Sequence, residues 1–159
     1  MTGDNGDLQA FRAKFRLDDL HLVRRDGWVL SLRPGQLTLG AMVLSVASGA
    51  QDLAALDDGE ALGLARGLGL AERLAREVYG AARINALCLM MQDPVVHFHI
   101  LPRYGAPVTR HGRLWQDADW PGPPRICPAE TPEPVLKALL DELRRAIALP
   151  EGHLFSRSR

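Results

Sequence analysis

The stretch PVVHFHILPR, residues 94–103, combines strand-forming residues with two histidines. Successive side chains of a β-strand point to opposite faces. One face then carries Val96, Phe98 and Ile100, and the other carries Val95, His97, His99 and Leu101. We expect the Phe98 face to belong to the core. The two imidazoles then stand about 7 Å apart on the other surface, where both can touch one phosphate group or one metal ion.

Further segments around this stretch also have strand character. Residues 84–91 precede it, and Gln92-Asp93-Pro94 between the two segments predicts a turn, so residues 84–91 and 95–101 are expected to form a hairpin. Upstream, residues 28–32 and 39–46 are short apolar runs separated by Arg33-Pro34-Gly35. They predict two more strands joined by a turn.

Two helices are expected in addition to the strands. Asp57 and Glu60 have the spacing of a capping box, and apolar residues at helical spacing follow as far as Gly80. Gly63 and Gly67 share one face of this helix and would let a sheet approach closely. After Thr131-Pro132-Glu133 the helical spacing returns, which predicts a C-terminal helix.

These elements indicate an α+β fold with an antiparallel sheet of about five strands, a long crossing helix and a C-terminal helix. A single domain is expected over residues 1–159, because this length is that of one ordinary globular domain. Residues 1–7 and the tail from about Glu151 are polar and are expected to be flexible, which leaves about 8–150 ordered. Residues 109–128 are rich in Pro, Gly and Trp and are expected to form a loop.

The composition excludes several classes of partner. Lys plus Arg equals Asp plus Glu at 19 each, so no global field attracts a nucleic acid polymer or an anionic membrane, whereas a small anionic ligand needs only local donors. Cys88 and Cys127 form no zinc-binding pair, and a reduced cytoplasmic setting is expected. The sequence predicts neither a membrane span nor an export signal.

The histidine pair has two simpler interpretations. The first makes both histidines plain surface residues of a sheet, which two imidazoles on one face beside Pro102-Arg103 argue against. The second is a metal site, completed by His111 or Asp93, as in β-barrel enzymes that use a His-x-His strand. The long helix fits such a barrel poorly, so we predict no metal and keep a His-x-His metal-dependent protein as the less favoured alternative.

The segment His97-Phe-His99-Ile-Leu-Pro-Arg103 resembles the second half of the signature of the histidine triad (HIT) superfamily. In that signature three histidines alternate with apolar residues and are often followed by two apolar residues and Pro-Arg. Alignment on Pro-Arg makes His97 the middle histidine and His99 the last, with Val95 in the first position. The other register, with His99 in the middle, displaces Pro-Arg by two residues. The order of elements resembles the family from about residue 17 to 125.

The resemblance implies a HIT-like fold, usually homodimeric, and nucleotide chemistry without a cofactor. The middle histidine, His97, would attack an α-phosphorus and form a nucleotidyl-histidine intermediate, while His99 would donate to the phosphoryl oxygens. Expected substrates are nucleoside phosphoramidates or dinucleoside polyphosphates, and water or another acceptor resolves the intermediate. The resemblance thus implies a hydrolase or a nucleotidyl transferase.

The family also suggests further substrate-binding residues. Gln92 lies where relatives contact the phosphate bridge, Asn85 where many carry a substrate-contacting Asn, and Arg103 at the end of the strand where it could add positive field. In the simpler interpretation Gln92 is a turn residue, Asn85 is a half-exposed strand amide and Arg103 is a solvated charge. The loss of the first histidine at Val95 leaves an alternative function open, namely a nucleotide-binding module with little or no turnover.

Overall fold

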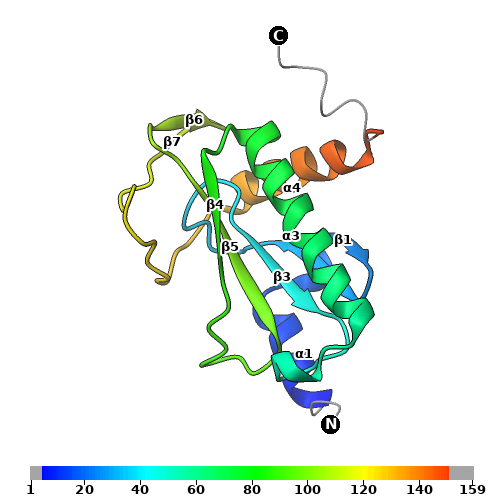
Figure 1. Ribbon diagram of the computed structural model, residues 1–159. Coiled ribbons are helices and arrows are strands. Elements are labelled where there is room, and N and C mark those ends of the chain that lie inside the picture. Colours follow the sequence, from blue (N-terminus) through cyan, green and yellow to red (C-terminus); the bar gives the residue numbers. More distant parts are fainter. Residues whose placement is uncertain (1–4, 151–159) are drawn as a thin grey trace.

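A computed structural model describes residues 5–150 and contains a five-stranded antiparallel sheet (Figure 1). The strands lie in the order β1-β2-β3-β5-β4. Their bounds are β1 His21–Arg25, β2 Trp28–Leu32, β3 Met42–Val46, β4 Arg83–Leu87 and β5 His97–Arg103. The predicted α+β class and the antiparallel sheet of five strands are confirmed. The expected flexibility of residues 1–4 and 151–159 concerns positions outside the described residues.

Helix α3, Asp58–Tyr79, is the long helix predicted from the sequence. The capping box is present: the Glu60 amide donates to the Asp57 carboxylate over 2.7 Å, and the Asp57 amide donates to Glu60 over 3.0 Å. Gly80 ends the helix with a φ of 72°, in the left-handed region that glycine adopts without strain. Both ends of α3 are therefore set by local sequence.

The small residues of α3 bring it close to the sheet. A Cβ added at Gly63 would lie 2.1 Å from the carbonyl oxygen of Asp26, and one at Gly67 would lie 2.9 Å from the Leu44 side chain. Only glycine permits this approach, as the sequence predicted. On this side of the sheet Phe98 packs against Trp28, with ring centroids 6.2 Å apart.

Helix α4, Glu133–Ala148, is the predicted C-terminal helix, and it packs against α3 and β1. Its buried face consists of Leu136, Leu139, Leu140, Leu143 and Ala146. The Tyr79 hydroxyl at the end of α3 donates to the carbonyl oxygen of Leu139 over 3.5 Å. No helix among residues 5–150 is long and apolar enough to cross a membrane.

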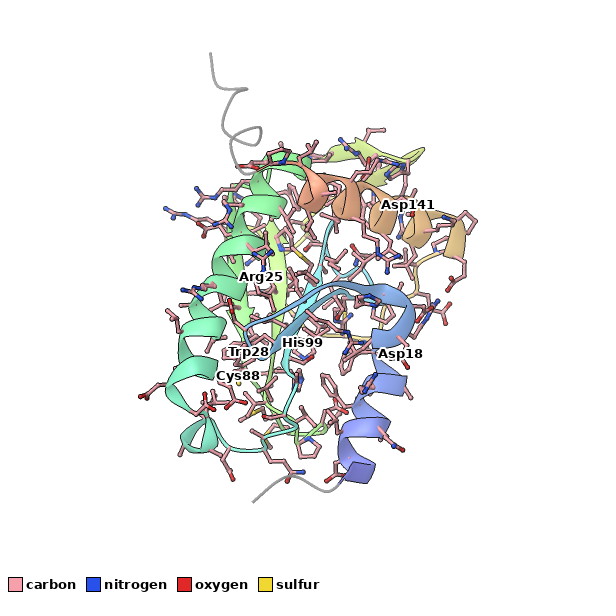
Figure 2. The ribbon with its side chains drawn as sticks, turned by 90° about the vertical axis from the view of Figure 1, so that its right-hand side faces the viewer. Asp18, Arg25, Trp28, Cys88, His99 and Asp141 are labelled. Atoms are coloured by element: carbon pink, nitrogen blue, oxygen red, sulfur yellow. The ribbon has the colours of Figure 1, made fainter. Side chains whose placement is uncertain are left out.

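The N-terminal helices were not predicted. Helix α1, Asn5–Lys14, begins inside the segment that the sequence analysis left out of the fold, and the short α2, Leu17–Leu20, follows it. Phe11 and Phe15 are buried at 2% and 6% exposure. Figure 2 shows α1 and α3 on opposite sides of the sheet. Helix α1 therefore covers the face that the sequence analysis left open.

Two predicted boundaries were wrong. Strand β4 ends at Leu87 and β5 begins at His97, so residues 88–96 form a loop where a tight turn was expected. Within the expected loop 109–128, β6 (Val108–Arg110) and β7 (Arg113–Trp115) form a small hairpin. His111 and Gly112 have positive φ values of 50° and 67°, which is the geometry of a tight hairpin turn. A 3₁₀ turn, η1 Leu53–Ala55, precedes α3.

Candidate functional site

Strand β5 places His97 and His99 on one face of the sheet, as the alternation predicts. Their ring centroids lie 4.9 Å apart and the rings are nearly perpendicular, at 83°. The two imidazoles lie closer together than the backbone spacing suggests, because their side chains converge. One small group can therefore contact both.

The histidine face is buried, which corrects the expectation that it forms an open surface. His97 is 2% exposed and His99 is 6% exposed. The ring of Phe11 lies 4.9 Å from that of His97, and the ring of Phe15 lies 5.8 Å from both imidazoles. The surface expectation was wrong because α1, which supplies both phenyl rings, was not predicted.

His97 is held in one tautomer. Its Nδ1 lies 2.6 Å from the carbonyl oxygen of Val95, and since a carbonyl only accepts, Nδ1 must carry the proton. Nε2 is then left with its lone pair. Burial lowers the pKa of His97, so the ring is neutral at neutral pH. Val95 thus orients His97 through its backbone, although its side chain lacks an imidazole.

His99 differs from His97 in having an unpartnered nitrogen. Its Nδ1 is buried and has no hydrogen-bond partner. Burial, with further contributions from His97 and Arg33, lowers the pKa of His99 to about 4. Ser45, which faces His97 across the β3–β5 pairing, also has a buried hydroxyl without a partner. Buried polar groups are normally paired, so these two atoms are candidates for contact with a ligand.

A pocket of about 460 Å³ opens beside the histidines. Its walls come from the end of α1, the loop before β5, Arg33 and the loop near Cys127. The lining residues are Lys14, Phe15, Arg33, Leu89, Met90, Met91, Gln92, Asp93, His97, His99, Ile126, Cys127 and Pro128. Lys14 pairs with Asp93 in this pocket, so Arg33 leaves an excess of one positive charge beside two neutral imidazoles, which suits an anionic ligand.

Gln92 lies on the pocket wall with the histidines and is exposed. The neighbouring Asp93 forms an ion pair with Lys14 over 2.7 Å. This pair ties the end of α1 to the loop before β5. The sequence analysis missed Lys14 and Phe15 together with α1, and it treated Arg33 only as part of a turn. The four-residue spacing of Phe11 and Phe15 was the signal that pointed to a buried helix face.

Asn85 and Arg103 do not line this pocket. Arg103 is 3% exposed and binds both carboxylate oxygens of Asp117, at 2.6 Å and 3.2 Å. It also donates to the Asn85 side-chain oxygen over 2.6 Å and to the carbonyl oxygen of Gly122 over 2.9 Å. The structure thus joins these two residues to each other, at the opposite end of β5 from His97.

The metal-site alternative has little support in the structure. Residues 5–150 contain no group of three or more His, Cys, Asp or Glu that could hold a metal ion. His111 instead contacts Glu142 of α4 over 3.0 Å, and Asp93 pairs with Lys14. Neither completes a ligand set with His97 and His99.

A larger pocket, of about 630 Å³, lies on the other face of the sheet between α3 and strands β1 and β2. No histidine lines it, and its walls include Trp28, Gly63, Gly67 and Arg66. Size alone would favour this pocket. The nucleophilic and unpartnered groups favour the smaller one, and catalysis depends on such groups.

The sequence gives no significant match to a protein-family model or to a curated protein. The structure does match solved structures. A histidine triad protein from Bradyrhizobium japonicum has a TM-score of 0.64 and 18% identity, over 82% of this chain and 92% of that one. One from Sinorhizobium meliloti has a TM-score of 0.62 and 19% identity, with the same coverage of 82% and 92%.

This chain has the histidine triad fold. A structure described as a hypothetical histidine triad nucleotide-binding protein, from Sulfolobus tokodaii, matches with a TM-score of 0.60 and 16% identity, over 80% of this chain and 83% of that one. The resemblance inferred from residues 97–103 is therefore confirmed at the level of the fold. In this fold β5 carries His97 and His99.

Proposed function

We propose that this protein binds a nucleotide in the pocket beside His97 and His99 and cleaves the bond to its α-phosphate through a nucleotidyl-histidine intermediate. The observation that carries the proposal is the state of His97: neutral, buried and with Nδ1 bonded to the Val95 carbonyl. A neutral imidazole fixed in this tautomer has its Nε2 lone pair free for attack.

The proposed reaction has two steps. Nε2 of His97 attacks the α-phosphorus, the N–P bond forms, and the leaving group departs with the electron pair of its bond. Water then attacks the same phosphorus and the N–P bond breaks, which returns a neutral His97 and a nucleoside monophosphate after loss of a proton. An acceptor other than water would make the enzyme a nucleotidyl transferase.

His99 is the proposed donor to the phosphoryl oxygens. It is neutral, since the pKa is about 4, and a neutral imidazole has one N–H to donate. Its unpartnered Nδ1 supports a role toward a ligand over a purely structural one. Gln92 is proposed as a further contact on the pocket wall. Substrates of the proposed class are nucleoside phosphoramidates and dinucleoside polyphosphates, and the proposed assembly is a homodimer.

One observation favours a second candidate function, nucleotide binding with little turnover. That observation is the burial of both histidines beneath the phenyl rings of α1. The sequence resemblance adds that Val95 takes the first triad position. A backbone carbonyl is fixed by the strand, whereas a third imidazole could rotate to orient His97. Errors of about 1 Å in orientation cost about 100-fold in rate.

The test is to incubate the full chain with adenosine 5′-phosphoramidate and with a dinucleoside polyphosphate, and to measure release of AMP. We expect His97→Ala to lower turnover by a factor of about 1,000 or more, as for other nucleophiles. His99→Leu, which has no donor, should lower it by a factor of about 100 or more, as for loss of one oxyanion donor.

The matched control is His111→Asn, which changes a histidine outside the pocket that contacts Glu142. Asn tolerates the positive φ of this position. Its turnover should stay near that of the wild type. Wild-type turnover in His97→Ala would refute the proposed mechanism, and binding of AMP without any turnover would favour the binding module.

A further inference from the structure

Arg33 is a half-buried arginine of the pocket, and no carboxylate among residues 5–150 pairs with it. It follows directly after β2, and its Nη1 donates to the carbonyl oxygen of Gly35 over 2.5 Å. Its Nε is buried and has no hydrogen-bond partner. Among residues 5–150 no carboxylate forms an ion pair with it.

The guanidinium of Arg33 therefore has hydrogen-bonding capacity that the described residues do not fill. Burial lowers the pKa of Arg33, yet a guanidinium remains charged at neutral pH. A buried charge without a partner is costly, and a guanidinium is best satisfied by an anion that accepts two hydrogen bonds. Arg103 shows the contrast, since Asp117, Asn85 and Gly122 satisfy it. Within residues 5–150 no group pairs with the Nε of Arg33, which leaves it open to an anionic ligand.

The sheet register separates the backbone of Arg33 from that of His99. His99 pairs with Val43 of β3, and Val43 pairs with Ser31 of β2, two residues before Arg33. Two strand spacings put the backbone of Arg33 about 10 Å across the sheet from that of His99. Both residues nevertheless line the same pocket of about 460 Å³. The other cation of this pocket, Lys14, is already neutralised by Asp93.

We propose that Arg33 recognises a second anionic group of the ligand, a phosphate or a carboxylate separate from the phosphoryl group that the histidines bind. The ligand is then a nucleotide with two anionic groups, one at the histidines and one at Arg33, within the same pocket. This inference rests on the proposed function for the position of the first anion. It does not depend on turnover, because it concerns affinity alone.

The experiment measures dissociation constants by calorimetry on the full chain. The reference ligand is AMP, which has one phosphate. The three test ligands add a second anion at different places: ADP on the phosphate chain, adenosine 3′,5′-bisphosphate on the ribose, and adenylosuccinate, with its carboxylates, on the base. A charge-assisted contact should make at least one of them bind about tenfold or more tightly than AMP.

Variants assign this preference to Arg33. Arg33→Met keeps the apolar stem and removes the charge, so the preference should vanish while AMP affinity changes less than about threefold. Arg33→Lys keeps the charge and should retain part of the preference. The control Arg24→Met removes an exposed charge whose nearest carboxylate partner, Asp18, is 3.8 Å away, and it should keep the full preference. Thermal unfolding without ligand shows that each variant is folded.

The outcomes separate this inference from the proposed function. A preference that depends on Arg33, in a protein without turnover, supports the inference and overturns only the catalytic proposal. Turnover without any preference for a second anion overturns the inference alone. Equal loss of AMP and test-ligand affinity in Arg33→Met would mean that Arg33 acts on the same phosphate as the histidines, which also overturns it, as does the absence of binding by all four ligands.

Discussion

The two ends of β5 differ in how their buried polar groups are satisfied. Three polar side chains alternate onto the same face of β5 and are similarly buried. Their exposed fractions are 2% for His97, 6% for His99 and 3% for Arg103. At the Arg103 end the guanidinium donates hydrogen bonds within the protein to Asp117, Asn85 and Gly122. At the histidine end Nδ1 of His99 has no partner, and a pocket lies alongside.

The fold itself satisfies the buried polar groups at the Arg103 end, whereas it leaves one unpaired at the histidine end, beside the pocket of the proposed ligand. A buried ion pair with complete hydrogen bonds fixes the path of the loop that holds Asp117, because breaking it would leave a charge without solvent. Unpaired buried groups lower stability, and functional sites are where proteins tolerate them. Three predictions test this comparison, from the largest effect to the smallest.

The largest effect is expected at the Arg103 end. Asp117→Leu leaves the Arg103 guanidinium buried without its carboxylate, and it should lower the free energy of unfolding by about 3–5 kcal/mol. Urea denaturation measures this change. The double variant Arg103→Met with Asp117→Leu removes both charges and should recover most of the loss. A single-variant effect below about 1 kcal/mol would show that this pair contributes little to the fold.

The histidine end should instead control stability in mild acid. The folded pKa of His99 is about 4, below the ordinary value of about 6.5, so the unfolded chain binds the proton first as the pH falls. Stability is therefore full above pH 6.5 and declines toward pH 4, by about 2 kcal/mol between pH 7.5 and pH 5 for His99 alone. Urea denaturation across this range measures the decline.

The Arg103 end provides the contrast in the same titration. Its hydrogen bonds from Arg103 hold the pKa of Asp117 below the ordinary value in spite of burial. That contribution is present above the ordinary carboxyl pKa and is lost only at lower pH. A stability that stayed flat from pH 7.5 to pH 5 would contradict the buried, neutral state of His99.

The smallest stability effect is expected for His99→Leu at pH 8. Because Nδ1 of His99 has no partner to lose, the apolar replacement should change the free energy of unfolding by less than about 1 kcal/mol, or raise it. It should also flatten the decline toward pH 5. If His99→Leu were as destabilising as Asp117→Leu, the two ends of β5 would not differ as described.

The sequence predicted the elements whose signals are local. The Asp57–Glu60 capping box and Gly80 set the ends of α3 within a few residues of chain. The alternation around Phe98 placed both histidines on one face without reference to any other segment. Gln92 lies in the histidine pocket, near the position that the family resemblance suggested.

The site residues that the sequence missed depend on distant contacts. Lys14 reaches the pocket through its pair with Asp93, 79 residues along the chain. Arg33 resembles an ordinary turn charge until the loop near Cys127 and the histidines are placed around it. Asn85 and Arg103 were predicted at a substrate site, but Asp117 and Gly122 are part of a loop without periodicity, so nothing local indicated that they would bind Arg103.

The amino-acid sequence by itself determined the strand that carries the histidines, the long helix with its caps and the α+β class, because hydrophobic period and capping act within a few residues. Only the tertiary structure decided that α1 buries the histidine face and that Arg103 is satisfied while Arg33 is not. Burial and charge pairing depend on contacts between segments that are far apart in the sequence, so no local pattern determines them.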